Sequence, residues 1–310
     1  MTPVLQTVPN FSEGRDPGFV EGVRDVFVRA GCEVLHTTMD PDHHRSVVTV
    51  IGAPGAVEDG AVTAARLALE RIDLRGHQGV HPRVGALDVL PFVPLHGLEM
   101  EDAVRSARRA GARIAALGLP VYFYARASKP PGRTLASVRR GGFEALREGR
   151  GHGGRADLPG REGGASALHR FAHPSGGAVC VGARAVLLAW NVDVEGLSYE
   201  AAKRIAAEIR EAGGGFRGLR ALAFHLRAQG RTQISMNLED PAATDPVDVF
   251  ATIEREVSRL GGRVNGTEVI GLGPDALASP AAVRAMRIRD WSDERLLGRR
   301  VDAWMTVAAG

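Results

Sequence analysis

The feature that most constrains the fold of this sequence is an order of strand-like and helix-like segments that occurs in both halves. In the second half, a strand-like run over residues 185–194 precedes an amphipathic helical segment that begins after Ser198. Two strand-like runs around a turn at Gly230 follow, and then a second amphipathic segment and an apolar run over residues 264–272. The order is β-α-β-β-α-β, and the first half shows it with an additional strand and helix.

Such a unit forms an antiparallel sheet with both helices on one face. We therefore expect an α+β protein with two tandem βαββαβ subdomains of the ferredoxin-like kind. Helix starts support this, because Asp16-Pro17 and Asp245-Pro246 each place an N-cap residue before a proline suited to the first helical position. Residues 134–148 are predicted to form a further helix.

The predicted boundary between the subdomains follows a change in composition. We expect the first subdomain to cover residues 1–180 and the second to cover residues 181–310. Residues 149–168 are rich in glycine and poor in apolar side chains, which predicts a flexible loop or a linker.

The composition favours a folded protein that binds a small anion. Of 310 residues, 44% are hydrophobic and 24% are charged, which is a usual globular balance. The net charge is +3, and lysine occurs only at Lys129 and Lys203. Arginine therefore dominates the positive charge, and it pairs bidentately with carboxylate and phosphate groups. The charge bias is too weak, and aromatic residues too few, to favour nucleic acid as a partner.

The targeting and redox signals indicate a reduced cytoplasmic protein. Cys32 and Cys180 lie in apolar stretches without a CxxC spacing, so neither a disulfide framework nor a cysteine metal site is expected. The N-terminus does not resemble a signal peptide. No run approaches the roughly 18 apolar residues that a membrane span needs, so no membrane partner is expected.

One stretch combines a polar loop with a buried strand. Residues 77–83 carry two histidines and an arginine, and residues 84–94 form an apolar strand-like run. Pro82 restricts His81 to extended conformations. A rigid support of this kind suits a reactive group, so His81 is the leading candidate for catalysis. The alternative is a surface turn with incidental histidines.

Three polar clusters follow predicted strands in the first half, over residues 10–14, 40–45 and 77–83. Loops at strand ends can converge on one site. A metal is not expected there, because His43 and His44 are adjacent and no HExxH spacing occurs. Serine nucleophiles are weaker candidates, because Ser12 and Ser46 lie in no nucleophile elbow.

Long motifs resemble the formiminotransferase domain of the glutamate formimidoyltransferase family. They are VPNFSEGR, DHHRSVVTVIG, GVHPRVGALDVLPFVP, PVYFYARASKPPGRTLASVRRGGFEAL, VGARAVLLAWNVDV and QISMNL. The resemblance implies two βαββαβ-type subdomains, a homodimer, and transfer of a formimino group from N-formimino-L-glutamate to N5 of tetrahydrofolate in histidine degradation. Tetrahydrofolate is then a co-substrate, and no metal is implied.

The resemblance also implies roles for individual residues. His81 falls at the position of the family's general base, and folate lies in a tunnel reached from both subdomains. The segment around Ser175, Gly176 and Gly177 would contribute to folate binding. The remaining substrate- or folate-binding candidates are Asn10, Asp40, Asp42, His43, Arg45 and Arg83.

Some candidate roles have alternatives. Arg45 and Arg83 suit the carboxylates of the substrates, but either can form a structural salt bridge. Asp40 or Asp42 can orient His81, and either can cap a turn.

The chain also departs from the resembled family in two places. Members commonly carry Asp-His-Asn-Arg where this chain has Asp42-His43-His44-Arg45, and commonly carry a P-D-F-G-P stretch that is absent here. Two alternatives therefore stay open, namely a folate enzyme acting on 5-formyl-tetrahydrofolate and a catalytically silent folate-binding protein. A third alternative, RNA binding, lacks the aromatic residues that RNA-binding sheets carry on their central strands.

Overall fold

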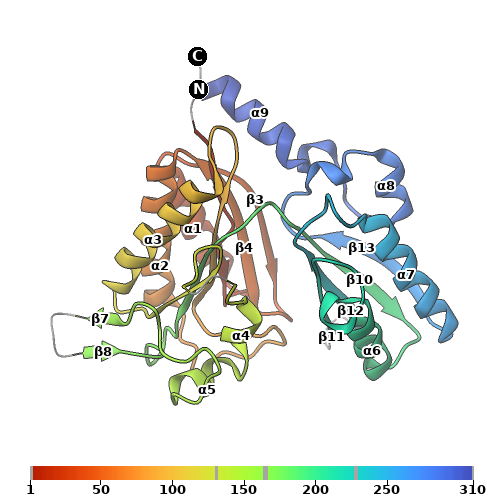
Figure 1. Cartoon of the computed structure of the whole chain (residues 1–310), viewed down its shortest axis with the longest axis horizontal. Coiled ribbons are helices and arrows are strands. Elements are labelled where there is room, and N and C mark those ends of the chain that lie inside the picture. Colours follow the sequence, from red (N-terminus) through yellow and green to blue (C-terminus); the bar gives the residue numbers. More distant parts are fainter. Residues whose placement is uncertain (1–2, 130–131, 163–166, 227–229, 309–310) are drawn as a thin grey trace. The chain divides into compact units, whose positions relative to one another are not determined.

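The computed structural model describes residues 3–129, 132–162, 167–226 and 230–308 (Figure 1). It divides into two compact units, Met1–Arg184 and Ala185–Gly310. The boundary expected from the sequence, between residues 180 and 181, falls inside strand β9 (Val179–Ala183), which pairs with strands of the first unit. Each unit has its own apolar core.

The first unit contains the predicted βαββαβ order. Its strands are β1 (Leu5–Thr7), β2 (Asn10–Phe11), β3 (Glu33–Asp40), β4 (Arg45–Gly52), β5 (Leu87–Pro94), β6 (Val121–Ala125) and β9. They pair in the order β3-β4-β1-β5-β9-β6, and β2 pairs with β4 and β5. Pairs from β3 to β5 are antiparallel, whereas β9 is parallel to β5 and β6.

Helices cover both faces of this sheet. The longer helices α1 (Pro17–Arg29), α2 (Pro54–Arg71) and α3 (Met100–Ala115) pack side by side on one face, orange to yellow in Figure 1. The short helices α4 (Leu135–Arg139) and α5 (Gly142–Arg147) contribute Val138 and Leu146 to a smaller apolar cluster with side chains of β5, β6 and β9. The Asp16 side chain caps α1 at the N–H of Gly18, as predicted.

The second unit repeats the ferredoxin-like arrangement. Its elements are β10 (Leu188–Glu195), α6 (Tyr199–Ile209), β11 (Leu219–Leu226), β12 (Arg231–Leu238), α7 (Pro246–Arg259) and β13 (Arg263–Val269). The strands pair antiparallel in the order β11-β12-β10-β13. Because α6 and α7 pack on the apolar face of this sheet, the α+β prediction with two βαββαβ subdomains is confirmed. Two helices that we did not predict follow, α8 (Pro280–Ala285) and α9 (Leu297–Ala308).

The structure differs from the sequence-based expectations in local details. The predicted helix over residues 134–148 is divided into α4 and α5, because Gly141 and Gly142 adopt positive φ angles of 93° and 71°. The polar cluster over residues 10–14, which was expected to be a loop at the end of a strand, begins with the short strand β2. Strand β9 was not predicted at all, because its pairing depends on strands far away in the sequence.

Residues 149–168 do not connect the two units. Backbone bonds link Leu158 to Val121 at the start of β6 (2.9 and 3.2 Å), and the carboxylate of Asp157 accepts the N–H of Phe123 at 2.7 Å. Strand β7 (Gly160–Glu162) pairs with β8 (Ala167–His169). The expected flexible loop also includes residues 163–166, which lie outside the described residues. Within the described ranges, no helix has the length and apolar character needed to cross a bilayer.

Candidate active site

The imidazole of His81 has a defined tautomer in this structure. Its Nδ1 lies 2.8 Å from the backbone oxygen of Pro82. A carbonyl oxygen can only accept, so Nδ1 carries the proton of the neutral ring and Nε2 carries the lone pair. The backbone therefore orients the imidazole at Nδ1 and makes Nε2 the basic atom.

The surroundings of His81 keep it neutral. Burial lowers the pKa of His81 well below its ordinary value, and the positive charges of Arg45 and Arg139 lower it further. His43 also contributes, and its ring centroid lies 5.9 Å from that of His81. A neutral imidazole at neutral pH can accept a proton without first losing one.

The loop that carries His81 packs against the turn between β3 and β4. The N–H of Val80 donates to the backbone oxygen of Asp42 at 3.1 Å. A Cβ on Gly79 would lie 2.6 Å from the oxygen of His43, so only glycine allows this approach. The rings of His44 and His77 stack with centroids 4.2 Å apart. Two of the polar clusters predicted from the sequence are thus brought together.

His44 and His77 occupy supporting positions in this contact. Nδ1 of His44 lies 3.0 Å from the oxygen of Gln78, and its Nε2 lies 3.3 Å from the Glu13 carboxylate. Burial lowers the pKa of His77 to about 4. His44 has a positive φ of 48°, a conformation in which Asn, Asp and His are enriched among non-glycine residues. His44, which stands where members of the resembled family commonly carry Asn, can therefore adopt the backbone conformation of this turn.

A buried carboxylate that sequence reasoning missed lies behind the His81 loop. Asp88 is 0% exposed and accepts the N–H of Val84 at 2.8 Å and of Gly85 at 3.3 Å. Its other oxygen accepts from Arg45 at 2.9 Å and from Arg139. Asp88 was recognisable as the one charged residue in the apolar run over residues 84–94.

Burial by itself would raise the pKa of Asp88, but the guanidinium groups of Arg139 and Arg45 hold it below its ordinary value. Burial lowers the pKa of Arg45 to about 10, so Arg45 is still cationic at neutral pH. We call Asp88, Arg45 and Arg139 the Asp88 triad.

The two arginines proposed from the sequence differ in their partners. Arg45 donates through Nε and Nη2 to the Asn10 side-chain oxygen, at 3.2 and 2.8 Å. Arg83 donates to the Glu144 carboxylate at 2.9 Å and to the backbone oxygen of His77 at 3.2 Å. Both side chains are largely buried and both take part in a salt bridge, so each has a structural role whether or not it contacts a substrate.

The predicted carboxylates near His81 act on the turn between β3 and β4. The Asp40 side chain accepts the N–H of His43 at 2.7 Å and thereby caps this turn. Asp42 contributes its backbone oxygen to Val80. Pro82 accepts the Nδ1 proton of His81, and the orientation of the ring by Asp40 or Asp42 stays a prediction.

The segment over residues 173–177 lies beside the strand that follows the His81 loop. Ala86 donates to the oxygen of Gly176 at 2.9 Å, and Gly85 forms an isolated bridge with Gly177. The N–H of Ser175 lies 3.3 Å from Nδ1 of His173. Gly177 has a positive φ of 69°. The buried glycines form the turn, and Ser175 is the partly exposed member.

Catalysis by a serine or cysteine nucleophile, or by a bound metal ion, has less support in the structure. The Ser12 hydroxyl donates to the oxygen of Gly85 at 2.7 Å inside the protein, and burial raises the pKa of Cys180 far above its ordinary value. The described residues contain no group of three histidine, cysteine, aspartate or glutamate side chains that could hold a metal ion.

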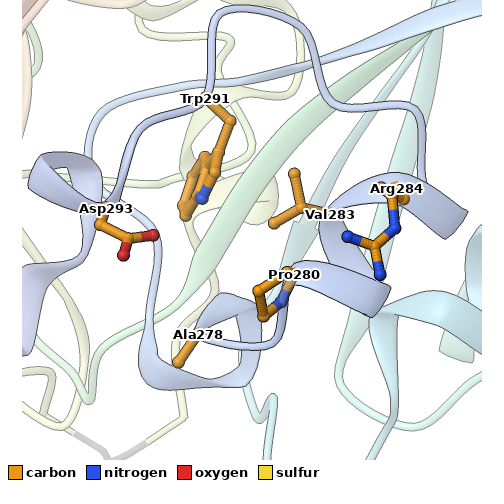
Figure 2. Close-up of a pocket in the computed structure, with 6 residues that line it drawn as sticks. All are labelled: Ala278, Pro280, Val283, Arg284, Trp291 and Asp293. Carbon is orange, nitrogen blue, oxygen red and sulfur yellow. The ribbon is translucent and has the colours of Figure 1, made fainter.

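A separate pocket lies in the second unit (Figure 2). It is open and has a volume of about 170 Å³, and its lining comprises Ala278, Pro280, Val283, Arg284, Trp291 and Asp293. The Asp293 carboxylate pairs with Arg299 at 3.0 Å. The lining contains one carboxylate, which is paired with Arg299, and no histidine, cysteine, serine or lysine, so the His81 cluster is the better candidate for catalysis.

Both units match one protein family. Residues 4–184 match the formiminotransferase domain, N-terminal subdomain, and residues 189–287 match the formiminotransferase domain. A glutamate formimidoyltransferase of Thermoplasma acidophilum is 35% identical, over 96% of this chain and 97% of its own length. One from Streptococcus pyogenes serotype M1 is 33% identical, over 94% and 96%.

Longer proteins match as well. A formimidoyltransferase-cyclodeaminase of Sus scrofa is 38% identical over 91% of this chain, and the match covers 52% of that protein. The chain therefore spans about half the length of this relative.

Proposed function

The chain belongs to the formiminotransferase family, and from this membership we propose that it is a glutamate formimidoyltransferase. It transfers the formimino group of N-formimino-L-glutamate to N5 of tetrahydrofolate, a reaction of histidine degradation. The observation that carries this proposal is the match of both units to the domain, together with a neutral imidazole at His81.

The proposed mechanism uses His81 twice. N5 of tetrahydrofolate attacks the amidine carbon and forms an N–C bond, while Nε2 of His81 accepts the N5 proton. The resulting tetrahedral intermediate then breaks its bond to the glutamate nitrogen, which takes the proton back from Nε2. The products are 5-formimino-tetrahydrofolate and glutamate, and His81 returns to its neutral form.

Positioning supplies the rest of the proposed catalysis. The two nitrogens must be held close to one carbon. Arg83 and Arg139 each have a buried Nε with no hydrogen-bond partner among the described residues, and such donors suit the carboxylates of the two substrates. We assign Asn10 and Arg45 to support of the site through their mutual bonds. Asp40, Asp42 and His43 shape the turn beside His81.

We also propose that Ser175, Gly176 and Gly177 form part of the folate site. Their segment hydrogen-bonds to the strand that follows the His81 loop, which supports this assignment.

Turnover assays test the proposed function. Purified protein with N-formimino-L-glutamate and tetrahydrofolate should yield glutamate and 5-formimino-tetrahydrofolate. The competing candidate is an enzyme acting on 5-formyl-tetrahydrofolate, and it rests on the absent P-D-F-G-P stretch. Turnover of 5-formyl-tetrahydrofolate without turnover of formimino-glutamate would overturn the proposal in favour of that candidate.

Folate binding should depend on salt. We expect calorimetric titration with folinic acid to show saturable binding that weakens as salt is added, because the carboxylates of the ligand meet arginine side chains. A neutral pterin without the glutamate tail is the control, and its affinity should change little with salt. Absence of binding at millimolar folinic acid would contradict the proposal.

The contact at Gly79 should be needed for activity. In Gly79→Ala, the added Cβ would lie 2.6 Å from the oxygen of His43 and 2.7 Å from the Cβ of His44, so the loop must shift. Displacement of a catalytic group by about 1 Å can cost on the order of 100-fold in rate, and we expect kcat/KM to fall about 10- to 100-fold.

Gly76→Ala is the matched control, because a Cβ there meets nothing within 4 Å. Equal activity of the two variants would show that the contact at Gly79 does not position His81.

We also expect a cytoplasmic homodimer, as the family resemblance implies. Sedimentation velocity at micromolar protein concentration measures the assembly.

A further inference from the structure

Arg139 differs from its neighbour Arg45 in how fully it is bonded. Arg45 donates to Asp88 and twice to Asn10. Arg139 donates to Asp88 through Nη2, whereas its Nε is buried and has no hydrogen-bond partner among the described residues. An unsatisfied buried donor on a cation is costly, so Arg139 has a donor group available to a ligand.

The net charge of the Asp88 triad also favours a bound ligand, and specifically an anion. It contains two guanidinium groups and one carboxylate. The side chains of Arg45 and Arg139 are only 10% and 14% exposed, and that of Asp88 is 0% exposed. Asp88 accepts four hydrogen bonds, and its single negative charge balances only one of the two guanidinium groups. A bound anion would supply the missing negative charge.

The position of Arg139 indicates which anion this is. Arg139 donates to Asp88, and the Asp88 carboxylate also accepts the N–H groups of Val84 and Gly85, directly after the His81 loop. A ligand of Arg139 therefore lies close to that loop. In N-formimino-L-glutamate, the α-carboxylate is two bonds from the nitrogen that His81 protonates. The carboxylates of the folate tail lie beyond an aromatic ring from N5 and are therefore farther away.

We propose that Arg139 binds the α-carboxylate of the formimino-glutamate donor. This inference rests on the proposed function and specifies which substrate carboxylate Arg139 binds. Asp88 accepts a hydrogen bond from Nη2 of Arg139 and so positions its guanidinium group. The α-carboxylate supplies the second negative charge that the triad lacks. The α-carboxylate then fixes the departing nitrogen beside Nε2 of His81.

A pair of truncated donors tests the assignment. N-formimino-γ-aminobutyrate lacks the α-carboxylate, and N-formimino-α-aminobutyrate lacks the γ-carboxylate. The wild-type enzyme should prefer the full donor over the first analogue by about 10- to 100-fold in kcat/KM, the usual effect of a hydrogen-bonded charge. In Arg139→Gln, this preference should fall to within about three-fold, because the partner of the deleted group is gone. The preference over the second analogue should persist.

The matched control is Arg140→Gln, which removes the neighbouring, exposed arginine of the same segment and should behave as wild type. Arg139→Lys keeps the positive charge but loses the planar guanidinium group. It should therefore show an intermediate preference for the full donor over the analogue without the α-carboxylate. This variant replaces Arg139→Gln in the test if Arg139→Gln does not fold. A second readout needs no turnover, since L-glutamate should raise the thermal midpoint of the wild type and not that of Arg139→Gln.

Two results would overturn the inference while leaving the proposed function intact. One is an undiminished preference for the α-carboxylate in folded Arg139→Gln. The other concerns KM values of Arg139→Gln. If its KM rises for tetrahydrofolate but not for tetrahydropteroate, which lacks the glutamate tail, and its KM for the donor is unchanged, Arg139 binds the folate tail instead. Failure of the wild type to use formimino-glutamate would instead refute the proposed function itself.

Discussion

Replacing His81 with alanine is expected to reduce kcat by about 10²–10⁴-fold, the usual effect of losing a general acid–base group. Folate affinity should stay within about three-fold, because the change removes a proton carrier rather than a binding group. His43→Ala and His77→Ala should cost less, since both rings support the loop and the adjoining turn. The measurement is steady-state kinetics, with far-UV circular dichroism to establish folding.

The exposed residue His152 provides the matched control, because His152→Ala removes an imidazole far along the chain from the site. The pH profile adds an independent check. The basic form of His81 is present above its pKa, and that pKa is lowered. Activity should therefore be retained as the pH falls through about 6.5, the ordinary value for histidine, and should be lost only below it. A folded His81→Ala enzyme with wild-type kcat would place the base elsewhere.

Asp88→Asn should have the largest effect on stability. The change removes the single negative charge of the Asp88 triad and leaves Arg45 and Arg139 buried beside a neutral amide. Breaking a buried ion pair by removing one partner typically costs about 3–5 kcal/mol in unfolding free energy. Urea denaturation followed by circular dichroism measures this loss.

The surface pair of Asp59 and Arg113 offers a comparison, since both side chains are about half exposed or more. Asp59→Asn should cost less than about 1 kcal/mol. The pKa of Asp88 is lowered in the folded protein, so its ionised form stabilises the fold. This contribution to the free energy of unfolding is fully present above about pH 4, the ordinary carboxyl pKa, and declines as the pH falls through the lower pKa of the folded state. Equal losses for the two variants would show that the triad does not stabilise the fold.

The sequence predicted the elements that depend on local signals. The caps at Asp16, Ser198 and Asp245 begin α1, α6 and α7 as expected, because a side-chain oxygen three or fewer residues away satisfies a helix N–H. The hairpin of β11 and β12 was likewise predicted from two strand-like runs around a turn at Gly230. The repeated order of these elements was sufficient to predict two ferredoxin-like sheets.

The candidate site was predicted only in part. His81 was proposed from its place between a polar loop and an apolar strand, and its catalytic role, which the resemblance of whole motifs implies, stays a prediction. Asp88 was visible in the sequence as a charge in an apolar run. Its role in holding a buried arginine depends on Arg139, which is 51 positions away in the chain. No periodicity or spacing connects those two residues.

What the sequence by itself determined is the succession of helices and strands, the fold class and the family, because these follow from local propensity, apolar periodicity and long collinear motifs. Only the tertiary structure decided that β9 lies parallel between β5 and β6. It also decided that the Nδ1 proton of His81 points to a backbone oxygen, and that one buried carboxylate holds two arginines beside the loop. The physical reason is that pairing, burial and charge balance arise between segments distant in sequence, where each partner is defined only once the chain is folded.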